Sequence, residues 1–267
     1  MNIKHLREII AYNKANQEVI QEKIKKYCSF ASIDIDNDIL NVLQIVRTSF
    51  QKKGFMVFEL PIDDDEIGAL CYKDDGIGYV MINSSLPKVN INFIIAHEIY
   101  HAFFCDCDSI CTVGVVDNEY YENKQEYAAN LFAGMLLMPE NNFRRMFLKF
   151  KSESNDGTFD TIIRLMSYYQ MTYMAVLIRC LELDLLDSNI VTDQQLSIDK
   201  ETIRKRLTEL WLDETIMNCS KKDDFFRLKK LVGENGKSYI CDEYINERDL
   251  KKALNNMDKL YQQIRRK

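Results

Sequence analysis

The sequence predicts an α+β fold that is rich in helices and contains a small antiparallel sheet of three strands. Apolar residues recur at helical spacing over most of the chain, and three short runs of strand-forming residues lie between residues 55 and 82. Glycine and proline are scarce, with 9 and 3 among 267 residues, which favours helices over a turn-dense all-β fold.

Two helices are predicted at the N-terminus, over residues 3–30 and 39–50. The second is expected to stop at Gly54, because glycine readily adopts the left-handed backbone that ends a helix. The three strands follow at residues 55–60, 67–72 and 77–82, and a polar hairpin turn joins the last two.

The remainder is predicted to be mainly helical. One helix is expected to begin at Asn90 or Asn92, either of which can cap it, and to end near residue 104. Another runs to Met138 and ends before Pro139, because the residue before proline disfavours the helical region. The other predicted elements are helices at 159–169, 172–186, 198–212 and 223–232, a strand at 238–244 and a final charged helix.

We expect two units, with a boundary near residue 188. Residues 1–187 contain the predicted sheet and the stronger helical patterns, whereas residues 188–267 form a mostly helical C-terminal accessory region. We found no internal repeat. The sequence does not indicate the oligomeric state.

Charge and composition exclude several classes of protein. The net charge of -6 argues against direct nucleic-acid binding as a main role, because that affinity comes from clustered basic residues. No signal peptide and no long uncharged apolar stretch is visible, so we expect no membrane association. The eight cysteines are expected to be free thiols in a cytoplasmic protein.

The chemistry is concentrated at residues 97–101, which read His-Glu-Ile-Tyr-His. Histidines four apart on a helix project from one face, so His97 and His101 are predicted to bind one Zn²⁺ ion. Glu98 is turned by about 100° from His97. It can therefore act as the general base on an attacking water without being a ligand, as in metallopeptidases with this motif.

A third protein ligand must come from elsewhere, since catalytic zinc commonly has three. The only other histidine is His5, so a carboxylate is expected, and the next predicted helix offers Glu126. Asn130 lies one turn further on the same face, where it can accept a hydrogen bond from a zinc-bound histidine. Glu119 and Glu122 are the alternative ligands.

At these residues the sequence resembles the ImmA/IrrE-type metallopeptidases. The segment HEIYH is followed by QEYAANLFAGMLLMPE, which matches their E-x-x-A-N-x-F-A-x-x-L-L-M-P pattern, and the resemblance covers roughly residues 50–185. It implies a zincin-like, gluzincin-type intracellular peptidase domain. It also implies a partner, since studied members cleave a helix-turn-helix transcriptional repressor and so derepress a mobile element or a stress regulon.

Other readings of these and neighbouring residues stay open. Tyr100, Tyr121 and Tyr127 are candidates to stabilise an oxyanion, although a structural role is expected for each. Cys105, Cys107 and Cys111 do not have the spacing of a common structural zinc site, and loop thiols are expected. A different class of function is a non-catalytic zinc-containing regulatory or DNA-binding module, which the intact Glu98 disfavours.

Overall fold

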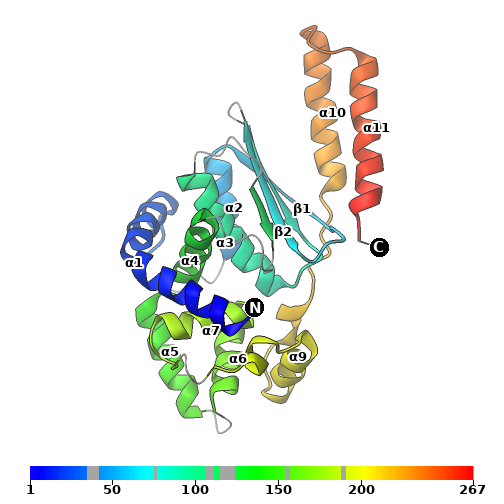
Figure 1. The fold of residues 1–267 in the computed structure, drawn as a ribbon. Helices are drawn as coiled ribbons and strands as arrows, with labels where there is room; N and C mark the ends of the chain where they lie inside the picture. The colour runs from blue at the N-terminus through cyan, green and yellow to red at the C-terminus, as the bar shows by residue number, and fades with distance from the viewer. Residues whose placement is uncertain are drawn as a thin grey trace.

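The computed structural model describes residues 1–34, 42–74, 77–105, 111–114, 124–153, 157–187 and 191–266, and it confirms a helix-rich α+β fold (Figure 1). The helices are α1 (Ile3–Ala31), α2 (Val42–Lys52), α3 (Lys88–Phe104), α4 (Lys124–Leu137), α5 (Glu140–Glu153), α6 (Thr158–Tyr169), α7 (Tyr173–Glu182), α8 (Asp193–Leu196), α9 (Lys200–Glu209), the 3-10 helix η2 (Glu214–Met217), α10 (Phe225–Cys241) and α11 (Glu247–Ile264). None of the described helices combines the length and apolar composition that a membrane crossing requires.

The sheet is mixed, so the prediction of a three-stranded antiparallel sheet needs correction. Its described strands are β1 (Phe55–Leu60), β2 (Ile67–Asp74), β3 (Ile77–Asn83) and β4 (Cys111–Gly114), in the order β1-β3-β2-β4. β3 is antiparallel to β2 but parallel to β1, and β4 adds an antiparallel edge. The strand β3 takes an inner position and separates β1 from β2, and its Val80 and Ile82 are fully buried.

The helix α2 ends close to where it was predicted to end, but the predicted N-terminal cap of α3 is wrong. Gly54 follows α2 with a φ of 83°, as expected for a glycine that ends a helix. The helix α3 begins at Lys88, after Pro87, and neither Asn90 nor Asn92 caps it. The Asn92 amide instead donates to the carbonyl of Gln170, 3.1 Å away, because that position is already inside the helix and faces the chain before α7.

The helix α3 is the central element of the molecule. It is buried along most of its length and lies between the sheet and α4, while α1 covers the other side of α4 (Figure 1). Rings from three helices meet here: Tyr27 of α1 packs edge-on against Phe103 of α3 and Phe132 of α4, with centroids 5.3 and 6.0 Å away. This packing holds α3 and α4 at a set distance and thereby positions the site.

The chain after residue 190 divides into two parts. Residues 191–224 pack on the rest of the protein, for example through Asp224, whose backbone N–H donates to the Glu59 carbonyl at 2.8 Å. The helices α10 and α11 then form a hairpin that extends away from the sheet (Figure 1). The predicted strand at 238–244 is wrong, since α10 continues to Cys241. Gly236 lets Leu250 of α11 approach too closely for any side chain at that position.

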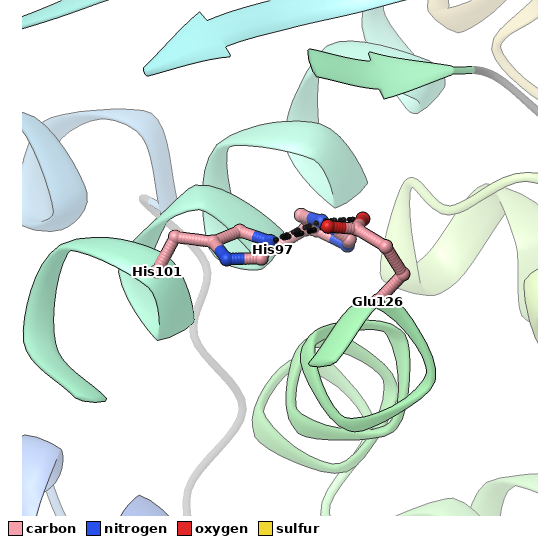
Figure 2. A group of neighbouring side chains, drawn as sticks. All are labelled: His97, His101 and Glu126. Carbon is pink, nitrogen blue, oxygen red and sulfur yellow. Dashed lines mark hydrogen bonds and ion pairs between the residues drawn. The ribbon is translucent and has the colours of Figure 1, made fainter. Parts of the chain in front are cut away.

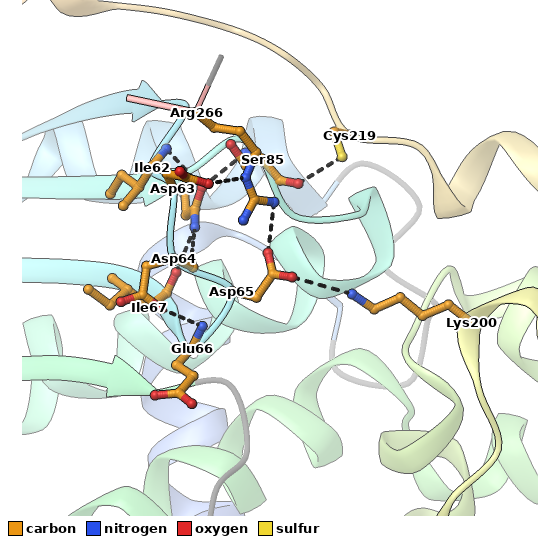
Figure 3. Close-up of polar contacts among 11 residues, drawn as sticks. Ile62, Asp63, Asp64, Asp65, Glu66, Ile67, Ser85, Lys200, Cys219 and Arg266 are labelled. Carbon is orange, nitrogen blue, oxygen red and sulfur yellow. Dashed lines mark hydrogen bonds and ion pairs between the residues drawn. The ribbon is translucent and has the colours of Figure 1, made fainter. Parts of the chain in front are cut away.

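The end of the hairpin is tied back to the segment between β1 and β2 (Figure 3). The guanidinium of Arg266 donates to Asp63 at 2.9 Å and pairs with Asp65 at 2.8 Å. Nearby, the Cys219 thiol donates to the Ser85 carbonyl at 2.7 Å. Because these contacts involve exposed charges, they orient the hairpin more than they stabilise it.

The replacement Arg206→Ala is expected to destabilise the protein by about 3 kcal/mol, because it removes a charged partner from a buried carboxylate. Two guanidinium nitrogens of Arg206 on α9 donate to the two oxygens of Asp160 on α6, each at 2.6 Å. Asp160 is only 2% exposed. Urea unfolding checks this, and the double variant Asp160→Asn/Arg206→Ala is the control. If the double variant is as unstable as Arg206→Ala, the loss of the charged partner of Asp160 is not the cause.

Candidate metal centre

Two helices bring three potential metal ligands together. His97 and His101 lie one turn apart on α3, and Glu126 comes from the first turn of α4 (Figure 2). The Nε2 atoms of the histidines are 3.0 Å apart. The carboxylate oxygens of Glu126 lie 3.1 Å from Nε2 of His97 and 3.3 Å from Nε2 of His101. The donor atoms of these three residues therefore converge on one point.

This donor set fits a small divalent cation. Ligands held at about 2.0–2.1 Å in a tetrahedron lie about 3.3 Å from one another, close to the separations seen here. Both histidines are fully buried and Glu126 is mostly buried. A cation at their meeting point satisfies three acceptor atoms at once, which a single proton does not do.

Asn130 orients the first histidine. Its Oδ1 lies 2.9 Å from Nδ1 of His97, so the N–H at Nδ1 donates to the amide carbonyl. With the proton on Nδ1, the lone pair of Nε2 points toward Glu126 and His101. This is the tautomer that a metal ligand requires, and it arises because Glu126 and Asn130 are one turn apart on α4.

The electrostatics favour neutral imidazole beside an ionised carboxylate. Burial lowers the pKa of His97, against the hydrogen bond to Glu126, which raises it. Burial also raises the pKa of Glu126, but its contacts with His101 and His97 outweigh that effect and bring its pKa to about 2. The centre therefore carries one negative charge on Glu126 and neutral His97, a combination suited to binding a cation.

Glu98 lies beside the three residues without joining them. It is fully buried, and among the described residues neither carboxylate oxygen has a hydrogen-bond partner of ordinary geometry. Burial raises the pKa of Glu98 well above its usual range, the Glu126 charge raises it further, and a contact with the Cys71 thiol acts in the opposite direction. This carboxyl is therefore poised to take up a proton.

Cys71 is the neighbour of this site that the sequence reasoning missed. It lies on β2, where Ala69 and Cys71 are both buried and point to the same face of the sheet. The alternation of buried and exposed residues along β2 identifies its inward face. That pattern does not predict that this face contacts Glu98. Only the packing of β2 on α3 brings the two residues together.

The tyrosines, cysteines and glutamates that the sequence also offered as candidates either pack against other side chains, lie at the ends of elements, or lie outside the described residues. Tyr100 accepts a hydrogen bond from Lys23 at 2.7 Å, and the ring of Tyr127 packs 5.0 Å from that of Tyr12. Cys105 follows α3, and Cys111 begins β4. Four of the residues lie outside the described ones: Cys107, Glu119, Tyr121 and Glu122.

A helix-borne His-Glu-x-x-His site completed by a carboxylate from the next helix defines a class of metal-dependent hydrolases. Residues 50–181 match the Peptidase M78 model, described as the IrrE N-terminal-like domain, so this segment belongs to the ImmA/IrrE-type metallopeptidase family. No curated protein matches the sequence.

Proposed function

We propose that this protein is a zinc-dependent endopeptidase of the cytoplasm that cuts a protein substrate. In this proposal His97, His101 and Glu126 hold the zinc ion, and Glu98 is the general base. The observation that carries it is the convergence of two buried imidazole nitrogens and one carboxylate within 4.8 Å of one another, beside a buried glutamate. The match of residues 50–181 to this peptidase family supports the proposed activity.

The roles of the side chains follow from their positions. A zinc ion held there would acidify water and polarise the scissile carbonyl. Glu98 accepts the proton of the attacking water, and its burial, which raises its pKa, favours uptake of that proton. Glu98 then delivers that proton to the leaving amine. Asn130 keeps Nδ1 of His97 protonated, so that Nε2 stays a ligand throughout.

For the substrate, we propose a partner helix-turn-helix repressor whose cleavage derepresses a mobile element or a stress regulon. This rests on the family alone.

Direct DNA binding through residues 172–186 is disfavoured, because the only basic residue of α7, Arg179, is 2% exposed. Its guanidinium donates to the Met138 carbonyl at 3.1 Å and so joins α7 to the end of α4. In the proposed organisation, residues 1–187 form the peptidase unit and 188–267 the accessory region.

Removal of the metal is expected to abolish peptidase activity reversibly. Elemental analysis of the purified protein should find about one zinc per chain, as expected for a single catalytic site. Treatment with 1,10-phenanthroline should stop cleavage of a candidate helix-turn-helix repressor, and added Zn²⁺ should restore it. A protein that neither contains nor binds zinc would refute the proposed metal, and cleavage that persists without any metal would refute the mechanism.

Asn130→Ala is expected to weaken zinc binding by about 10- to 100-fold, the range for partners that orient a ligand. The side chain bonds Nδ1 of His97, and its loss frees the imidazole to rotate and to change tautomer. Competition with a zinc-binding dye measures the affinity. Asn92→Ala is the control, because Asn92 is a buried asparagine whose amide bonds a carbonyl away from the ligands. Equal affinities for the two variants would contradict the role of Asn130.

A further inference from the structure

A cavity adjoins the candidate metal centre at Asn130. Its volume is about 400 Å³, within the range of small-molecule sites, and α1, α3, α4, α7 and residues 196–200 enclose it. On α3 its wall is formed by Phe93 and Ile94, one turn before His97. None of His97, Glu98, His101 or Glu126 is among the described residues that line it, so the cavity is separate from the metal centre.

Most of the exposed wall is apolar, with a smaller polar part. Ile9, Met174, Ile178 and Leu196 contribute apolar surface from three different segments. The polar lining residues include Asn13, Asn130 and the pair Arg179–Glu182, whose charged groups are 2.9 Å apart. An apolar chamber with a few convergent polar groups is the usual character of a site for a small organic molecule.

Asn130 links this cavity to the metal centre. Its Oδ1 is engaged by Nδ1 of His97, but its Nδ2 has no acceptor among the described residues, and the side chain is only half-buried. The amide thus faces two ways, with its carbonyl on a proposed metal ligand and its N–H₂ group available to an occupant of the cavity. An occupant with an oxygen acceptor would complete the hydrogen bonds of Asn130.

The cavity is wider at Gly134, because this residue has no side chain to occupy it. It lies within α4 at the cavity wall, and a Cβ atom added there would meet nothing within 4 Å. Glycine inside a helix is less favourable than alanine, and here neither a positive φ nor a close neighbour requires it. The missing side chain enlarges the cavity one turn beyond Asn130.

We propose that this cavity binds a small, mainly apolar molecule with a carbonyl or hydroxyl oxygen that accepts a hydrogen bond from Nδ2 of Asn130. Binding would hold Asn130 in the orientation that fixes the His97 tautomer, so the ligand and the metal would strengthen each other's binding. Binding to the cavity is independent of the proposed peptidase function, whereas the coupling to zinc rests on it.

The test of binding uses the full-length, metal-free protein and two matched probes. 2-Acetylnaphthalene has one carbonyl acceptor, and 2-isopropenylnaphthalene replaces that C=O by C=CH₂ at nearly the same shape. In NMR titrations the ketone should bind saturably and at least about fivefold more tightly than the olefin, as expected for one hydrogen bond to an otherwise unpaired group. No saturable binding of the ketone, or equal binding of both probes, would overturn the proposal.

Two variants locate the binding. Gly134→Leu places a side chain in the cavity and should weaken ketone binding more than about tenfold, whereas Gly134→Ala fills little of it and should change binding less than about threefold. Unchanged binding in Gly134→Leu would place the ketone elsewhere and refute the site. If Gly134→Leu does not fold, the comparison of ketone and olefin binding to the unmodified protein tests the proposal.

A separate measurement tests the coupling. The dissociation constant of Zn²⁺ is measured with and without saturating 2-acetylnaphthalene, and the ketone should lower it by the factor by which zinc improves ketone binding. A zinc affinity unaffected by the ketone would refute the coupling and leave the cavity site intact. A protein that binds the ketone but no zinc would instead refute the proposed function.

Discussion

The variant Glu98→Gln is expected to keep its zinc and to lose about 10³-fold in kcat for peptide cleavage, within the range for a missing general base. Glutamine has nearly the shape of glutamate but does not accept the proton of the attacking water. The carboxyl of Glu98 is not one of the three converging donors, so zinc content should be unchanged. Single-turnover cleavage of the repressor and elemental analysis of the same sample measure both quantities.

The fold should tolerate this replacement. Glu98 is fully buried and has no hydrogen-bond partner of ordinary geometry among the described residues, so a neutral amide of nearly the same shape breaks no such bond and brings no charge into the interior. We expect the metal-free variant to unfold at a urea concentration no lower than the unmodified protein. Glu22→Gln, on the exposed surface of α1, is the control and should cleave normally. Cleavage by Glu98→Gln at the normal rate would show that another group accepts the proton.

The variant Glu126→Ala is expected to weaken zinc binding by more than 100-fold and to remove activity at ordinary zinc concentrations. The loss should exceed the roughly 10- to 100-fold effect of a partner that only orients a ligand, because Glu126 is expected to supply a coordinating oxygen and the only negative charge among the three donors. Dye competition measures the affinity, and activity measured at increasing zinc separates weak binding from lost chemistry.

Glu122→Ala is the informative control for Glu126. Both Glu119 and Glu122 precede α4, lie outside the described residues and were alternative ligands on the sequence alone. The variant Glu122→Ala should bind zinc as the unmodified protein does. The opposite result, normal affinity in Glu126→Ala and loss in Glu122→Ala or Glu119→Ala, would transfer the ligand to the segment before α4.

Local sequence patterns predicted most helices and strands. The errors concern features that depend on contacts between elements. The order β1-β3-β2 was not foreseen, because alternation within a strand identifies its faces but not its neighbours. The strand was expected at 238–244, but α10 continues to Cys241 and packs along α11, with Leu250 close to Gly236. The cap at Asn90 or Asn92 failed because Pro87 and Lys88 already begin α3.

The sequence by itself determined which side chains are available for chemistry. His97 and His101 share a face because four residues make just over one helical turn, and Glu126 and Asn130 share a face for the same reason. Only the tertiary structure decided that these two faces meet, that Cys71 lies against Glu98, and that a cavity adjoins Asn130. Contacts between elements depend on the packing of side chains far apart in the chain, and helical periodicity does not encode that packing.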